Sequence, residues 1–345
     1  MTPYAALALQ LTARSVETAA DPRAQMIAHI SEVATKMRAA TLFIEQYGGS
    51  PVRLVVLPEY LFTSYPGRIS IPDFATQAAW AVDGAEYAAL GTVAQDQALY
   101  LAGNAYETDA HFPGLYFQTS FVIAPSRDVV LRYRRLNSMY APTPHDVWDK
   151  YLDIYGIDGV FPVAKTEIGN LAAIASEEIL YPEIARAHAL RGAEVFVHSS
   201  SEIGSPVHTN KMIAKRARAS ENMAWVVSAN TAGIIGTSLQ LNSADGNSMV
   251  VDWKGNVVAE SNAGETFTAF ADVDIAALRA ARRKPGMTNY LSRQRTEIFA
   301  STYAAPSHQR SNSLIDGAVV KTPDRDHFNR VQAETLERLA KDGLI

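Results

Sequence analysis

The sequence predicts an α/β protein with one layered domain over residues 1–278 and a C-terminal arm over residues 279–345. Three observations support this fold class. Short runs rich in β-branched residues alternate with longer helical stretches up to about residue 275. No segment typical of a linker interrupts that alternation, and the chain beyond it is basic and rich in loop residues. We expect the arm to pack on the body or on a partner subunit.

The composition excludes several classes of protein. The 345 residues are 48% hydrophobic and 19% charged, which is enough apolar material for a large core. The net charge of −5 argues against nucleic acid as a partner. The N-terminus lacks the pattern of a signal peptide and no stretch reaches the length of a membrane span, so we expect a cytoplasmic protein that binds no membrane. The chain contains no cysteine, which excludes disulfides, thiolate metal sites and a cysteine nucleophile.

The first half of the chain reads as strands separated by helices. Residues 7–13 are expected to form the opening strand, and residues 21–48 a helix with Pro22 near its start. Residues 53–60 contain a buried strand that ends at Pro58, because proline cannot donate to a central ladder. Further along, the patterns indicate a helix near 83–98 and strands at 99–107, 115–125 and 129–136.

The second half begins with an irregular segment, residues 137–156, that is rich in aromatic and turn-forming residues. Such a segment is typical of a lid or a pocket wall. The turn at Gly255 joins two short strands, because glycine accepts a positive φ there. The remaining predicted elements are strands at 171–178, 194–200, 225–233, 248–255 and 256–260, and helices at 181–193, 208–223 and 322–343.

Three predicted strands end on chemically capable groups: Glu59, Arg135 and Ser176. The carboxyl ends of strands in an α/β sheet share one rim, where such folds bind ligands. The set offers a general base, a fixed cation for an oxyanion and a hydroxyl nucleophile. Taken singly, each residue also fits a structural role, as a solvated loop charge, a surface cap and a helix cap. No phosphate loop, dinucleotide fingerprint, zinc motif or nucleophile elbow occurs, so we expect neither cofactor nor metal.

Five separated blocks occur in one order over residues 5–275: LVVLPEY, YRRL, IASEEILYPEIARAHALRGAEVFV, KRARASENMAWVVSAN and GNSMVVDWKGNVV. This order resembles the nitrilase superfamily of carbon–nitrogen hydrolases. The resemblance implies a four-layer α-β-β-α sandwich, usually dimerised through helices, and a catalytic glutamate, lysine and cysteine. Glu59 falls on that glutamate, Arg135 on the lysine and Ser176 on the cysteine, so two of the three positions depart from the family's pattern.

The same resemblance assigns roles to other residues. Asp146 falls near the place where many members carry an additional active-site glutamate. Glu178 resembles the acidic residue that braces the turn after the nucleophile, and Arg186 its ion partner. Expected oxyanion or substrate contacts are the Glu177 backbone N–H, Asp146, Tyr60, Trp148 and His198.

Three functional hypotheses stay open from the sequence. The first is a hydrolase of small amides or related acyl compounds that works through a Glu59–Arg135–Ser176 site. The second is a silent binding or scaffold protein, and the third an engineered Cys-to-Ser form of an ordinary amidase or nitrilase. Arg135 weighs against the third, because an inactive form needs only one change. In an alternative register, Lys150 supplies the lysine. We expect a small-molecule substrate and a homodimer or higher homo-oligomer.

Overall fold

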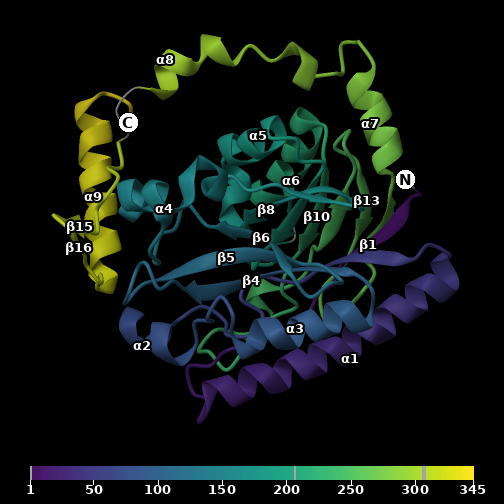
Figure 1. Cartoon of the computed structure of the whole chain (residues 1–345), viewed down its shortest axis with the longest axis horizontal. Helices are drawn as coiled ribbons and strands as arrows, with labels where there is room; N and C mark the ends of the chain where they lie inside the picture. Colours follow the sequence, from purple (N-terminus) through teal and green to yellow (C-terminus); the bar gives the residue numbers. More distant parts are fainter. Residues whose placement is uncertain (1, 206, 305–307) are drawn as a thin grey trace.

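The chain folds into four layers, with two β-sheets packed face to face and helices on both outer sides (Figure 1). The structure is a computed structural model that describes residues 2–205, 207–304 and 308–345. Helices α1 and α3 cover the first sheet, and α5 and α6 cover the second (Figure 1). The predicted α-β-β-α sandwich is therefore confirmed.

Each large sheet contains six strands in mixed orientation. The first has the order β14 (Phe270–Val273), β1 (Tyr4–Ala8), β3 (Val52–Val56), β4 (Tyr100–Thr108), β5 (Tyr116–Ile123) and β6 (Val129–Arg134). The second has the order β13 (Val257–Glu260), β12 (Met249–Val251), β10 (Trp225–Ala229), β9 (Val195–Ser199), β8 (Gly169–Ala175) and β7 (Ala164–Thr166). The strands β1, β3 and β4 run parallel, as do β8, β9 and β10. Parallel neighbours bring their carboxyl ends to one edge of each sheet.

Helix α1 (Pro22–Gly48) shows how local sequence sets an element's ends. Asp21 accepts a hydrogen bond from the Ala24 N–H, and Pro22 occupies the first turn, where no N–H bond is needed. Gly49 ends the helix with a φ of +79°, which other residues adopt only with strain. The outer layers are completed by α3 (Ala85–Asp96), α5 (Pro182–Leu190) and α6 (Asn210–Asn222).

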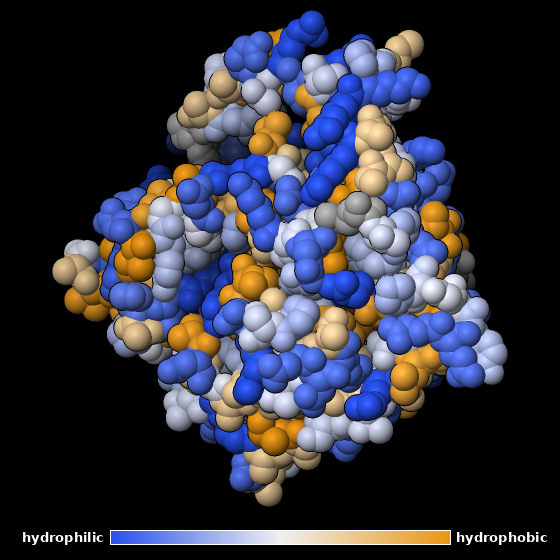
Figure 2. All heavy atoms as spheres, turned by 45° about the vertical axis from the view of Figure 1, so that its right-hand side comes forward, coloured by the Kyte–Doolittle hydropathy of each residue, from blue (hydrophilic) through white to orange (hydrophobic). Residues whose placement is uncertain are grey.

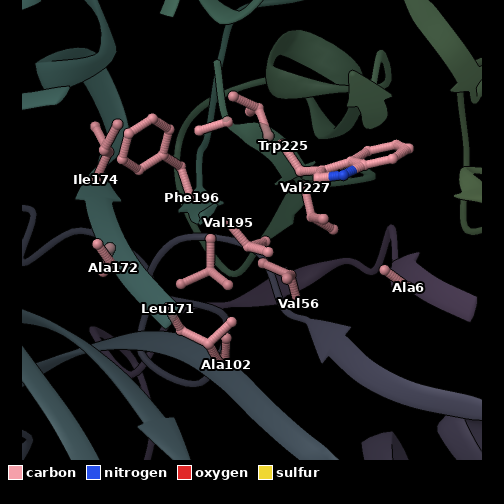
Figure 3. Packing of buried hydrophobic residues seen from close by; sticks show 14 of the residues in the cluster. Ala6, Val56, Ala102, Leu171, Ala172, Ile174, Val195, Phe196, Trp225 and Val227 are labelled. Atoms are coloured by element: carbon pink, nitrogen blue, oxygen red, sulfur yellow. The ribbon is translucent and has the colours of Figure 1, made fainter. Parts of the chain in front are cut away.

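The core between the sheets is built from buried apolar residues of both sheets (Figure 3). Ala6, Val56 and Ala102 come from the first sheet and are fully buried. Leu171 and Val195 face them from β8 and β9. Burying one such leucine or valine side chain stabilises the fold by about 1.5–3 kcal/mol, so this interface fixes how the two sheets lie against each other.

The segment 137–156 is more regular than the sequence predicts. It contains a 3-10 turn at Pro144–Val147 and most of helix α4 (Trp148–Val160), which is bent at Gly156. A capping box formed by Thr143 and Asp146 starts the turn. The structure also contains elements that the sequence reading did not include, among them α2 (Ile71–Gln77), α7 (Ile275–Arg283) and the edge strand β14.

The arm leaves the body after α7, passes over the α5 side and descends beside α4 (Figure 1). It contains the hairpin β15 (Ile315–Asp316) and β16 (Val319–Val320) and ends in α9 (Arg325–Lys341). Phe328 of α9 is buried, and the Ser313 hydroxyl donates to Asp146 at 2.7 Å. These contacts anchor the end of the arm to the body.

The middle of the arm buries little apolar surface. Ile298, Phe299 and Tyr303 are all more than half exposed in the single chain. Figure 2 shows a mainly hydrophilic face on which apolar residues form small, separate groups. Among the described residues, no helix is long and apolar enough to cross a membrane.

Candidate active site

A cavity of about 470 Å³ lies where β3, β6 and β8 end. It brings Glu59, Arg135 and Ser176 together, although the first and the last are 117 positions apart in the sequence. The strand-end rule predicts this juxtaposition. The other lining residues are Tyr60, Tyr65, Pro66, Gly67, Tyr106, Gln118, Ser138, Met139, Tyr140, Ala141, Glu177, Ser201, Lys211 and Arg325.

Ser176 follows β8 in a sharp turn. Its φ of +48° lies in the left-handed region, which a serine occupies only when its surroundings hold it there. The ring of His198 supplies that hold, because Nε2 lies 2.7 Å from the Ser176 carbonyl oxygen and Nδ1 lies 2.8 Å from the Ser228 hydroxyl. Burial lowers the pKa of His198 well below its usual value, so the ring is neutral and donates from Nε2.

Arg135 follows β6, and nearly all the N–H donors of its guanidinium form hydrogen bonds. Its guanidinium donates to the Asn137 carbonyl at 2.6 Å, to Gln118 Oε1 at 2.6 Å, to Glu59 Oε1 at 3.5 Å and to Glu177 Oε1. Four of the five N–H donors of an arginine thus have acceptors. Burial alone disfavours the charged form, but the neighbouring carboxylates, Glu59 first, outweigh it and raise the pKa of Arg135.

Glu59 is buried in the turn after β3. Its Oε1 accepts a hydrogen bond from Gln118 Nε2 at 2.7 Å in addition to the contact with Arg135. Asn104 in turn accepts from Gln118 at 3.1 Å and donates to Ser120 at 3.1 Å, so the amide of Gln118 has a fixed orientation. The sequence reading missed Gln118 and Asn104. Both lie inside β strands, whereas the prediction considered only residues that follow the end of a strand.

Glu178 links the nucleophile turn to the end of β6. Its carboxylate accepts hydrogen bonds from the backbone N–H groups of Leu136 and Asn137, at 2.7 and 2.9 Å, and from the Tyr133 hydroxyl at 2.7 Å. Burial raises the pKa of Glu178, while these donors and Arg135 oppose that shift. The residue therefore fixes the strand end that carries Arg135 relative to the turn that carries Ser176.

Several expected site residues lie elsewhere. Asp146 is not among the lining residues of this cavity, because Thr143 and Ser313 hold its carboxylate; it lines a neighbouring cavity that shares Ser138, Met139 and Glu177. Trp148 packs in a separate apolar cluster beside α4, and the Lys150 ammonium lies 5.2 Å from the centre of the Phe112 ring. His198 supports the backbone of the turn instead of facing the cavity.

The expected ion partner of Glu178 is also placed differently. Arg186 on α5 is half-buried and has no hydrogen bond to Glu178. Burial lowers the pKa of Arg186, and the carboxylate that acts against this shift is that of Glu221. Backbone N–H groups, which carry no sequence signal, satisfy Glu178 in place of an arginine.

Two cations in the cavity were not predicted. Lys211, in the first turn of α6, places Nζ 3.3 Å from the Ser176 hydroxyl oxygen. Arg325, the first residue of α9, reaches the cavity from the arm and donates to the Ile69 carbonyl. Neither follows a strand, so only the folded chain reveals them. Among residues 2–205, 207–304 and 308–345, no group of three or more acidic or histidine side chains could hold a metal ion.

Comparison with known proteins identifies the family. The carbon–nitrogen hydrolase family matches residues 12–283, which is most of the chain. The chain belongs to the carbon–nitrogen hydrolase family. It is 25% identical to an omega-amidase NIT2 of Mus musculus over 250 residues, covering 72% of this chain and 85% of that protein.

Solved structures show the same fold at low identity. A carbon–nitrogen hydrolase from Helicobacter pylori G27 superposes with a TM-score of 0.64 at 20% identity, covering 88% of this chain and 98% of that one. Saccharomyces cerevisiae Nit3, a member of branch 10 of the nitrilase superfamily, gives a TM-score of 0.62 at 20% identity, covering 83% and 95%. This carbon–nitrogen hydrolase thus has the nitrilase fold and a chain without cysteine.

Proposed function

We propose that this protein hydrolyses a small, non-peptide amide through an acyl-serine intermediate on Ser176. The observation that carries the proposal is the cavity itself, in which a strained serine, a buried carboxylate and a buried guanidinium converge. The amidase relatives agree with an amide substrate, and a hydroxyl nucleophile suits an amide or ester better than a nitrile.

In the proposed reaction, the Ser176 oxygen attacks the carbonyl carbon of the amide and forms a C–O bond. The C–N bond then breaks, and the leaving amine takes up the proton that the hydroxyl lost. Water attacks the resulting ester, one water proton returns to the serine oxygen, and the carboxylic acid leaves. Glu59 is the proposed base for that water, and its assignment as the base for Ser176 stays a prediction.

The transition-state oxyanion needs donors. The Glu177 N–H lies in the first turn of the 3-10 helix at Ser176–Leu180, where a backbone N–H has no partner within the helix. Arg135 retains one N–H beyond the four already engaged. We propose that these two donors hold the oxyanion, with Gln118 and Glu59 fixing the orientation of the guanidinium.

The test is intact-protein mass spectrometry after incubation with a panel of amides, activated esters and nitriles, alongside ammonia release. We expect an acyl adduct on the wild type and none on Ser176→Ala. Ser126→Ala removes an exposed hydroxyl far from the cavity and should keep the adduct. If the wild type forms no adduct and releases no ammonia while Ser176→Cys reacts, the fold serves as a binding protein and the proposed chemistry is wrong.

We also propose that the protein is a cytoplasmic homo-oligomer whose arm takes part in assembly. The exposed apolar residues in the middle of the arm support this role, because apolar groups left in water favour association. Removing residues 284–345 should change the oligomeric state measured by light scattering or cause aggregation. Unchanged size and solubility would contradict that role.

A further inference from the structure

The Ser176 hydroxyl has one hydrogen-bond partner among the described side chains, and that partner is Lys211. The Lys211 Nζ lies 3.3 Å from Oγ, within reach of a proton transfer. Lys211 is not at the position that the family resemblance assigns to a lysine, where this chain carries Arg135. The contact is therefore a feature of this chain that the family pattern does not supply.

The structure fixes Lys211 where it is. It lies in the first turn of α6, whose start is capped by the Thr209 hydroxyl, which accepts from the Met212 N–H at 3.2 Å. One turn further, Lys215 is fully buried and pairs with Glu202 at 3.4 Å, and Thr209 donates to the same carboxylate. These contacts anchor the first turn of α6 at the cavity edge.

Lys211 is also free to act. Within the described part of the chain it has no carboxylate within 4.0 Å, whereas Lys215 is held by Glu202. Glu59, in contrast to Lys211, is tied to other side chains, because its Oε1 already accepts hydrogen bonds from Gln118 and Arg135. Among the described side chains, no hydrogen bond joins Glu59 to the Ser176 hydroxyl, whereas Lys211 contacts it directly. Arg135 cannot accept a proton at all, since arginine stays charged in proteins.

We infer that Lys211 is the proton acceptor for Ser176 in the acylation step. This inference rests on the proposed hydrolysis and adds a catalytic residue to it. As Oγ attacks the carbonyl carbon, its proton passes to the lone pair of Lys211 Nζ, and the C=O π electrons move to the oxygen. When the oxyanion collapses and the C–N bond breaks, the Lys211 ammonium gives that proton to the leaving nitrogen. The lysine is then neutral again, and the enzyme carries the acyl-serine.

The first experiment tests whether Lys211 acts as a proton acceptor or only as a positive charge. Lys211→Met removes both properties, whereas Lys211→Arg keeps the positive charge and cannot accept a proton. We expect both variants to lose at least about 100-fold in the rate of acyl-adduct formation, which is the scale of general base catalysis. Lys150→Met is the matched control, because Lys150 lies over Phe112 outside the cavity, and it should keep the wild-type rate. Circular dichroism establishes that each variant is folded.

The second experiment changes the nucleophile. A thiol ionises far more readily than a hydroxyl and needs less help from a base. In the Ser176→Cys background, Lys211→Met should therefore cost less than about 10-fold in the adduct rate. Methylamine added to Lys211→Ala should restore part of the adduct rate in the Ser176 enzyme, because a free amine can take the place of the missing base.

The outcomes are distinct. A Lys211→Arg variant that acylates at the wild-type rate would make Lys211 a fixed cation and overturn the inference, with the proposed hydrolysis intact. A Lys211→Met variant at the wild-type rate would exclude any role in acylation. A wild type that forms no adduct would refute the proposed function itself, and the role of Lys211 would fall with it.

Discussion

His188, in the core behind the site, provides a quantitative test of how this protein responds to acid. The ring is fully buried on α5 and packs edge-on against Tyr133 and Phe161. Burial lowers its pKa from 6.5 to about 3, so the native protein keeps the ring neutral at pH values where the unfolded chain binds a proton. A lowered pKa of this kind gives stability above pH 6.5 that is lost as the pH falls toward 3.

The magnitude follows from the free energy of 1.36 kcal/mol per pKa unit. Between pH 7 and pH 5 the unfolded histidine becomes almost fully protonated, while the native ring, with a pKa of about 3, stays neutral. His188 should therefore remove about 2 kcal/mol from the free energy of unfolding over this interval. His188→Leu abolishes the titration, so the pH 7 to pH 5 difference should shrink by about 2 kcal/mol.

Urea denaturation at both pH values measures this difference. The matched control is Ile184→Val, a change without titration in the same helix, which should lower the free energy of unfolding equally at pH 7 and pH 5. The readout is the difference between the two pH values, so the packing cost of leucine cancels. A His188→Leu variant with the full pH dependence of the wild type would refute the neutral, buried histidine.

Three further predictions concern the contacts around the site. Glu178→Ala leaves the buried Tyr133 hydroxyl and the part-buried N–H groups of Leu136 and Asn137 without an acceptor, and it should lower the free energy of unfolding by about 2–5 kcal/mol in urea, with Glu178→Gln much milder. Asp146→Ala removes the cap at Thr143 and the bond from Ser313, so we expect a loss of about 1–3 kcal/mol and faster tryptic cleavage in the arm. Tyr303→Phe removes an exposed bond to Glu183 and should change stability by less than about 0.5 kcal/mol; a larger change would mean that the arm is held there.

The fold, and the meeting of Glu59, Arg135 and Ser176 at one cavity, were predictable from the sequence because both depend on repeated local patterns. Buried strands end abruptly at features such as Pro58, and the residue after each end lies on a shared rim. Glu59, Arg135 and Ser176 all belong to that class, and the cavity contains them. The edge strand β14 was harder to predict, because it is short and is defined by its pairing with β1.

Other residues could not be placed because their roles depend on distant contacts. Gln118 is one polar residue within a strand, and only its contact with Glu59 marks it. Asp146 was expected in the site, but its carboxylate binds Ser313, a residue 167 positions later in the chain. Lys211 lies on a helix, 35 residues after Ser176, so no spacing rule for strand ends includes it.

If Ser176 and Arg135 occupy the positions that the family resemblance assigns to them, the proposed chemistry of the site is consistent as a set. A serine nucleophile needs a stronger proton acceptor than a cysteine does, because its hydroxyl is a far weaker acid. Arg135 cannot take a proton, and it donates one hydrogen bond to Glu59 Oε1 at 3.5 Å. In the proposed reaction Arg135 serves only as a donor, and Lys211 is the group whose Nζ lies 3.3 Å from the Ser176 hydroxyl oxygen. If the nucleophile and the lysine position changed together, the base must come from a third element, and α6 is the element whose side chain contacts Oγ.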